Sequence, residues 1–559
     1  TTPLRFEVFT TKDGTQAGAG EIGGTGGGAN SSDVADALVD DDRGWSDGFL
    51  NGSVSSTNKI KPAKYGVIYH ANQSVNRKDE IVPHMYQDPT PPANVPGGTG
   101  FMRGIWTAEA YGMKINMNIS GSLATSLEWA LDPSSPTDPT KSGPAFNARI
   151  RQGVQSGLFS MLGGVYAEHI MRYFEGAGNP NRASIALRNK VLKKLYTAGY
   201  QPKVMHAPER VVRATTLDDI VFDGTYRATY LDENAHLAEW YPADYANVRN
   251  RNRVWKINNL YVFWINEDAD RRKFWPQNGG LNIETREMLV DKALDATYTG
   301  YPDQLVLVFD DWEAYAGNSF AGPQNNNPNQ WDQTVKWIKT HPWIEDVSLE
   351  DVLVNRIDVG NWTDVVVKNG LNNTQGFVDT YDWLNHAAED SYDKWYYGSG
   401  QERNFSTMPA IRTGNYPGTG DVGPKTLGDI TTAGTVIKDT WDNVTSIANA
   451  GLRSLAEAAY SMMIFETAWH DEDATDYTKN GGGGWNFPDA SYDEISGWQI
   501  QNANHIRDVN ILKDVDSWNA SPPGGVTIAT QRDIDMDGEG EYIIKNQNVY
   551  FVFENDGGR

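Results

Sequence analysis

Two groups of carboxylates stand directly after short apolar stretches of the sequence. The first group follows the apolar run 305–309 and consists of Asp310, Asp311 and Glu313. The second follows the shorter run 203–205 and centres on Glu209. Ligands bind at the carboxyl ends of the strands in barrels and open α/β sheets, so acids in these positions are candidates for chemistry.

Two such acids, held close together, could cleave a glycosidic bond with retention of configuration. This reaction needs one ionised carboxylate as nucleophile and one protonated carboxyl group as acid, about 5–5.5 Å apart. Arg210 would keep a neighbouring carboxylate charged, and the crowd of acids near Asp311 would help keep one of them protonated. A structural interpretation stays open: Glu209 and Arg210 as a local ion pair at a helix start, and the acids after 305–309 as a polar loop with a helix cap.

The elements that must position these acids alternate between strand and helix. Strands are predicted at 65–70, 113–119, 203–205 and 305–309, the last apolar throughout, as expected for a parallel strand covered on both faces. Helical spacing is found across 146–174 and 183–197. This alternation is the signature of an α/β barrel or a doubly wound sheet.

Several short motifs occur along the same stretch in a fixed order. They are YHANQS at 69–74, GGVYAEHIMRYF at 163–174, GYQPKVMHAPERVV at 199–212, TYLDENAHLAEW at 229–240 and FDDWEAYAG at 309–317. Together they resemble the signature regions of glycoside hydrolase family 57, known for α-amylases, 4-α-glucanotransferases, amylopullulanases and branching enzymes. The resemblance runs from about residue 65 to 345 and, more weakly, to about 510.

The resemblance implies a role for individual residues. Glu209 matches the Glu-Arg-Val of the third region and becomes the nucleophile, and Asp311 matches the Asp of Asp-x-Glu and becomes the general acid/base. Carboxylates and imidazoles can bind sugar hydroxyls, and Trp offers an apolar face to a pyranose ring. The implied sugar contacts are His70, Gln73, Glu168, Asp232, His236, Trp312 and Glu313. Trp275 of KFWP is a further aromatic candidate that could equally belong to the core.

The resemblance also implies the architecture, an α/β fold built on an incomplete TIM-like (β/α)7 barrel. We assign the catalytic barrel to residues 61–350, after a loop-rich N-terminal extension at 1–60. A loop-rich and helical region at 351–515, with helices expected at 447–464 and 495–512, is predicted to pack on the barrel. A small β unit with a hairpin completes the chain at 516–559.

The β unit contains an acidic DxDxDGxxE loop formed by Asp533, Asp535, Asp537 and Glu541. Alternating acids turned by a glycine suit a hard cation with oxygen ligands, so the loop is predicted to hold a structural Ca²⁺; the alternative is a merely acidic turn. No cofactor is expected for catalysis, because the sequence shows neither an HExxH-like arrangement nor a credible phosphate-binding loop.

Composition restricts the partners. With 48 basic and 73 acidic residues the net charge is −25, which disfavours nucleic acid and anionic membrane as partners. No apolar run is long enough to suggest membrane insertion. The chain has no cysteine and begins at Thr1, which fits a mature secreted or cell-surface protein, so an extracellular location is predicted.

The expected partner is an α-glucan polysaccharide or oligosaccharide, and the favoured activity is amylase-type cleavage of α-glucosidic bonds. A 4-α-glucanotransferase or branching enzyme would use the same site. From another class, the alternative is a catalytically silent carbohydrate-binding or cell-surface structural protein. The presence of both Glu209 and Asp311 argues against a silent protein, whereas YHANQS in place of the family's usual His-Gln-Pro triplet argues for one.

Overall fold

The computed structural model describes residues 61–71, 101–130, 142–175, 178–266, 283–312, 315, 328–371, 430–465, 497–536 and 539–554. The predicted extension at 1–60 lies outside the described residues, as do four predicted site residues: Gln73, Trp275, Glu313 and Asp537. Within the described part, the strands form two five-stranded sheets and one three-stranded sheet.

The first sheet contains the strand that ends in Asp311. Its main path runs β3-β2-β1-β8, with β9 also paired to β1, and every pairing is parallel. All nine residues of β1 are buried, as a strand covered on both faces requires. The strands are β1 (Ala63–Ala71), β2 (Ile115–Ile119), β3 (Phe159–Met161), β8 (Leu305–Asp311) and β9 (Ile344–Asp346).

The second sheet contains the strand that precedes Glu209. Its order is β10-β6-β7-β5-β4, parallel except for the β6–β7 pair. The strands are β4 (Val204–Met205), β5 (Ala228–Asp232), β6 (Val254–Ile257), β7 (Leu260–Ile265) and β10 (Val365–Lys368).

Main-chain hydrogen bonds join the two sheets beyond β3 and at the end of β7. Beyond β3, Gly163 donates its N–H to the carbonyl of Val204 at 2.9 Å, and it accepts the N–H of His206 at 2.9 Å. At the end of β7, Asn266 donates its N–H to the carbonyl of Leu307 in β8 at 2.9 Å. These contacts and the parallel strands confirm the predicted α/β class.

Helices lie between the strands, as the alternating pattern predicts. The expectation of one helix across 146–174 is wrong, because Gly157 adopts a left-handed conformation (φ +76°) and ends α6, after which the chain enters β3. The helices of this part are α4 (Phe101–Tyr111), α5 (Gly121–Leu127), α6 (Gly143–Gln155), α7 (Pro180–Leu192), α8 (Ala214–Ile220), α9 (Ala238–Trp240), α10 (Pro242–Tyr245), α11 (Ile283–Leu294) and α13 (Pro328–Thr340).

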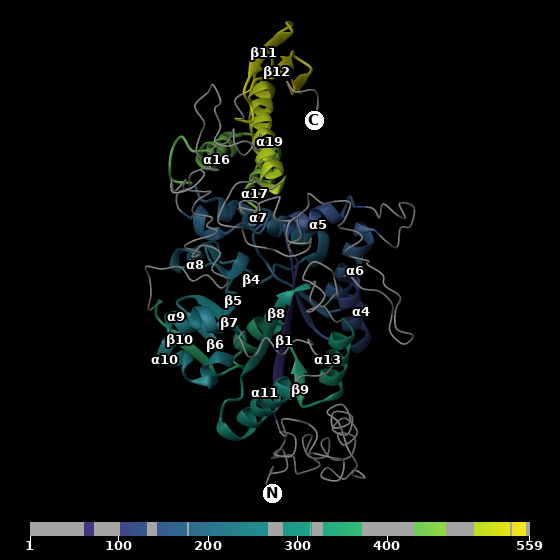
Figure 1. The fold of residues 1–559 in the computed structure, drawn as a ribbon, viewed down its shortest axis with the longest axis vertical. Coiled ribbons are helices and arrows are strands. Elements are labelled where there is room, and N and C mark those ends of the chain that lie inside the picture. The colour runs from purple at the N-terminus through teal and green to yellow at the C-terminus, as the bar shows by residue number, and fades with distance from the viewer. Residues whose placement is uncertain are drawn as a thin grey trace, which may run out of the picture.

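A second group of helices packs above these sheets (Figure 1). It comprises α16 (Val436–Ser446), α17 (Ala450–Met463) and α19 (Gly497–Ala520). Buried side chains such as Trp441 and Tyr460 share one apolar cluster with Tyr166 and Phe174, which follow β3. The helical region therefore rests on the segment that contains Glu168.

The long helix α19 runs from α17 toward a small sheet at the far end of the molecule (Figure 1). This sheet is antiparallel in the order β11-β12-β13, and β12 and β13 form the expected hairpin. Its strands are β11 (Ile528–Arg532), β12 (Glu541–Lys545) and β13 (Tyr550–Phe553).

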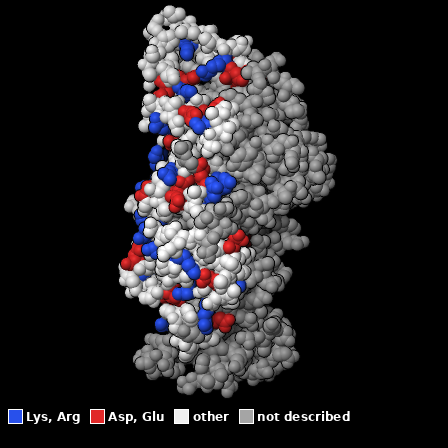
Figure 2. Space-filling view, turned by 90° about the vertical axis from the view of Figure 1, so that its left-hand side faces the viewer, with Lys and Arg blue, Asp and Glu red and all other residues white. Residues whose placement is uncertain are grey.

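Basic and acidic side chains are intermixed on the face of the described surface shown in Figure 2. The net negative charge is thus not gathered into one broad patch on that face. None of the described helices combines the length and the apolar character that crossing a membrane requires.

Candidate active site

Glu209 and Asp311, the two predicted catalytic acids, follow β4 and end β8, respectively. Glu209 is half-buried in the short turn Pro208–Arg210, and Asp311 is an exposed residue at the strand end. They are close enough to interact, since the negative charge of Glu209 raises the pKa of Asp311. The structure thus brings together the two acids that lie about one hundred residues apart in the sequence.

Asp311 has the acid–base behaviour that a proton donor needs. Its pKa is raised from the ordinary value of 3.8 to about 6, mainly because the surrounding protein displaces water, and further by the charge of Glu209; Arg210 acts in the opposite direction. Although the surrounding protein displaces water from it, Asp311 remains exposed at the surface, so a proton on its carboxyl group is accessible to a ligand. Its neighbour Asp310 is used differently, since one of its carboxylate oxygens accepts the N–H of Asp311 at 2.7 Å.

The turn that carries Glu209 has an unusual backbone. Both Glu209 (φ +48°) and Arg210 (φ +51°) are in the left-handed region. A non-glycine residue in that conformation costs about 1–3 kcal/mol and persists only where its surroundings hold it. Glu168 also has a positive φ, of +54°, so three of the six described non-glycine residues with positive φ lie at this site.

His70 lies beside Asp311, because the two residues are paired in the β1–β8 register. Its Nδ1 is 2.8 Å from the amide nitrogen of Asn118, whose amide oxygen accepts a hydrogen bond from Arg188 at 3.4 Å. The Asn118 amide group therefore donates to His70 Nδ1, which places the ring proton on Nε2. Burial lowers the pKa of His70 to about 3, so the ring is a neutral donor suited to a hydroxyl group.

Glu168, another of the predicted sugar contacts, is completely buried. The pKa of Glu168 is raised to about 8, chiefly by burial; Arg188 acts in the opposite direction, and the charge of Glu209 contributes to the rise. Its Oε2 is 3.7 Å from His206 Nε2. The His206 ring in turn is 4.7 Å from the His70 ring, centroid to centroid. Glu168 is thus a protonated acid near neutral pH, close enough to the site to interact with Glu209.

Asp232 and His236 were predicted to contact sugar, but both side chains are completely buried. Asp232 accepts hydrogen bonds from Arg210 Nε at 2.8 and 3.1 Å. His236 Nε2 is 2.7 Å from the carbonyl oxygen of Arg210. Both side chains therefore contact Arg210, the residue next to Glu209, from the interior of the protein.

The prediction that Trp312 stacks on a sugar ring is wrong. The side chain is completely buried in the apolar core, where it stacks on Phe101 at 5.0 Å and lies 5.3 Å from Tyr69. Helix α4 also approaches it closely, since a Cβ added to Gly104 would lie 2.8 Å from Trp312 Nε1. With its ring packed in this way, Trp312 supports the end of β8.

Sequence reasoning missed two residues that organise the site, Asn118 and Arg188. Asn118 is next to last in β2, so the rule that located Glu209 and Asp311 at strand ends could also have found it. Arg188 lies within α7 and is completely buried, a position that no local pattern identifies.

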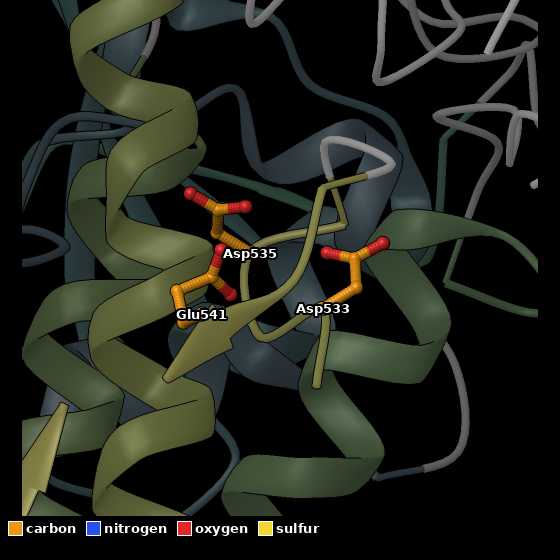
Figure 3. A group of neighbouring side chains, drawn as sticks. All are labelled: Asp533, Asp535 and Glu541. Carbon is orange, nitrogen blue, oxygen red and sulfur yellow. The ribbon is translucent and has the colours of Figure 1, made fainter. Parts of the chain in front are cut away.

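The predicted metal loop lies beside the middle of α19, where the Asn510 side-chain amide donates to the carbonyl of Ile534 (Figure 3). Asp533, Asp535 and Glu541 each offer a carboxylate oxygen within 4.8 Å of the others. Asp535 and Glu541 are buried, and Glu541 also accepts the N–H of Ile534 at 2.5 Å. The fourth predicted ligand, Asp537, lies outside the described residues.

Comparison with known proteins gives one family match. Residues 105–347 match the family model described as glycosyl hydrolase family 57. None of the curated proteins matches the chain.

Solved structures similar to this chain include three enzymes. The 4-alpha-glucanotransferase of Thermococcus litoralis is 14% identical over 88% of this chain, with a TM-score of 0.47, and this chain spans 65% of its length. A branching enzyme of Thermococcus kodakaraensis is 11% identical with a TM-score of 0.45 over 81% of this chain and 89% of its own. The alpha-amylase AmyC of Thermotoga maritima is 8% identical with a TM-score of 0.39 over 82% of this chain and 94% of its own.

Proposed function

We propose that the chain, whose residues 105–347 match the glycosyl hydrolase family 57 model, is a glycoside hydrolase that cleaves α-glucosidic bonds in α-glucans with retention of configuration. The observation that carries the proposal is the acid pair at the strand ends. Asp311 has a pKa of about 6, and Glu209 lies close enough to contribute to that value. A protonated acid beside a second carboxylate is the arrangement that a retaining glycosidase requires.

In the first step, the Glu209 carboxylate attacks the anomeric carbon and forms an ester bond with it. The glycosidic C–O bond breaks at the same time, and the proton of Asp311 passes to the leaving oxygen. In the second step, the Asp311 carboxylate removes a proton from water, whose oxygen attacks the anomeric carbon and releases Glu209. Two displacements restore the original α configuration.

His70 is the described residue best suited to bind a sugar hydroxyl. Its Nε2–H is fixed by Asn118, and its β-register places it opposite Asp311. The contacts that join the two sheets beyond β3 and at the end of β7 support closure of the strands into the predicted incomplete (β/α)7 barrel. In such a barrel the site lies at the carboxyl ends of the strands.

Transfer to a second sugar would follow the same steps, with a sugar hydroxyl in place of water. We favour amylase-type hydrolysis. The test below distinguishes it from a glucanotransferase, a branching enzyme and a silent binding protein.

The protein is incubated with soluble starch and, separately, with maltooligosaccharides, alongside Glu209→Gln and Asp311→Asn. Asp310→Asn serves as the control for removal of a neighbouring charge.

New reducing ends that disappear in both site variants but persist in Asp310→Asn support hydrolysis by this pair. Longer or branched products without a net gain of reducing ends would move the assignment to transfer. Retained binding with no product from any α-glucan would contradict the enzymatic proposal and favour the silent protein.

We also propose that the acidic cluster of Asp533, Asp535 and Glu541 holds a structural Ca²⁺. Convergence of three carboxylates, two of them buried, supports the proposal, because a cation would offset their mutual repulsion. Thermal unfolding is measured with Ca²⁺ and with a chelator, where saturating ion at 100 times its Kd would add about 2.7 kcal/mol. Asp535→Asn should abolish the dependence on Ca²⁺ and exposed Asp442→Asn should keep it; an unfolding temperature that ignores Ca²⁺ would refute the proposal.

A further inference from the structure

The turn that carries Glu209 cannot hold its conformation by local backbone preference. Two consecutive non-glycine residues, Glu209 and Arg210, are left-handed. Within the turn, the N–H of Arg210 donates to the carbonyl of Ala207 at 2.9 Å, and the N–H of Val211 donates to the carbonyl of Pro208 at the longer distance of 3.3 Å. The remaining restraint must come from residues packed against the turn.

The side chain of Arg210 provides one such restraint. Its Nε donates to both carboxylate oxygens of Asp232, at 2.8 and 3.1 Å, and both side chains are buried. Its guanidinium carbon also lies 4.2 Å from the centre of the Phe309 ring. Asp232 ends β5 and Phe309 lies in β8, two residues before Asp311. One side chain thus connects the turn after β4 with β5 and with the strand that carries the general acid.

His236 provides the second restraint, on the main chain of Arg210. A carbonyl oxygen can only accept, so the 2.7 Å contact with Arg210 O requires the ring proton on Nε2. Nδ1 then accepts the N–H of Asp232, at 3.3 Å. Burial lowers the pKa of His236 to about 4, which keeps this tautomer neutral under mild conditions. Side chain and main chain of Arg210 are therefore both fixed, from one short segment, 232–236.

We propose that Asp232 and His236 are positioning residues, which clamp Arg210 and thereby hold the Glu209 carboxylate in line with the anomeric carbon and at a fixed distance from Asp311. This inference rests on the proposed function of Glu209 and deepens it. It replaces the sugar contacts expected for these two residues, because their buried side chains are bonded to Arg210.

The clamp is tested by three substitutions. His236→Leu removes the donor to Arg210 O, whereas His236→Gln can place an amide N–H near the position of Nε2 and should restore it. His341→Leu is the matched control, because His341 is buried and its Nδ1 is 2.6 Å from the carbonyl of Trp337, in another part of the fold. Unfolding temperatures of all three identify variants that have merely lost stability.

The first readout needs no activity. Hydrogen exchange of peptides covering 207–212, measured by mass spectrometry, should be faster in His236→Leu than in the unmodified protein and unchanged in His236→Gln and His341→Leu. Unchanged exchange in His236→Leu would overturn the clamp, whatever reaction the protein catalyses. Failure of the proposed function alone would leave this result standing.

The second readout tests action through Glu209. A misplacement of about 1 Å can cost a factor of about 10², so His236→Leu should lower kcat on maltooligosaccharides by that order with little change in KM. When Glu209→Ala is supplied with azide and an α-glucosyl fluoride, azide replaces the carboxylate. Adding His236→Leu to that variant should then have no further effect. A raised KM, or a further loss of the azide-dependent rate, would show that His236 acts on the substrate and would overturn the proposal.

Discussion

Asp311→Asn is the substitution whose effect the structure defines most fully. The pKa of Asp311 is about 6, so about one molecule in ten carries the proton at pH 7 and about one in a hundred at pH 8. The first displacement needs the protonated form. In the unmodified protein, kcat/KM should therefore fall about tenfold per pH unit above pH 6.

The asparagine variant should lose this alkaline limb and, with a glucan whose leaving group needs the proton, about 10²- to 10⁴-fold in kcat/KM. An α-glucosyl fluoride loses fluoride with little acid assistance, so its first step should be nearly unchanged and its second step slow. Azide needs no general base and should speed that second step, giving the α-glucosyl azide. Product release is followed by fluoride electrode and the anomer by proton NMR.

Asp310→Asn is the control, because Asp310 adjoins Asp311 and accepts its N–H. This variant should keep the alkaline limb and show no azide rescue. The reasoning fails if Asp311→Asn retains the limb, if its azide product is the β anomer, or if Asp310→Asn reproduces its behaviour.

Three further substitutions test how the site is supported. Trp312→Ala opens a cavity in the core and should cost about 3–5 kcal/mol in denaturant unfolding; a higher KM without loss of stability would restore the sugar-stacking role. Gly163→Ala would drive a Cβ into the ring of Tyr226 at the contact between the two sheets, and a lowered unfolding temperature is expected; unchanged stability would show that the contact adjusts freely. Asn118→Leu removes the partner that fixes the His70 tautomer, so kcat/KM on maltooligosaccharides should fall, while the unfolding free energy should change less than in Trp312→Ala. Unaltered kinetics would exclude His70 from substrate binding.

The sequence located the strand ends because parallel strands leave a simple signal. An apolar run followed at once by acids, as at 305–311, identifies both a buried strand and the side chains at its carboxyl end. The same rule applied to 203–205 led to Glu209, and motif order joined the two sites. The rule identifies which acids directly follow a strand, because the residue types within one short segment determine this.

The sequence did not show which way each side chain after a strand would face. Asp311 and Trp312 are adjacent, yet the first is exposed and the second is buried in the core. The Arg210–Asp232 pair depends on how β4 lies against β5, a register that neither segment specifies alone. Similarly, the apolar spacing across 146–174 suits a helix, and a single left-handed residue, Gly157, decides that the chain turns into β3 instead.

The most direct test of the account is to trap the covalent intermediate on Glu209. In 5-fluoro-α-D-glucosyl fluoride, the ring fluorine slows both displacements and the fluoride leaving group favours the first, so a glucosyl ester should accumulate. Mass spectrometry of a proteolytic digest should find the added sugar on the peptide containing Glu209, and none in Glu209→Gln. A protein that cleaves α-glucan but carries the label on another residue, or never carries one, would contradict the assignment of Glu209 as the nucleophile.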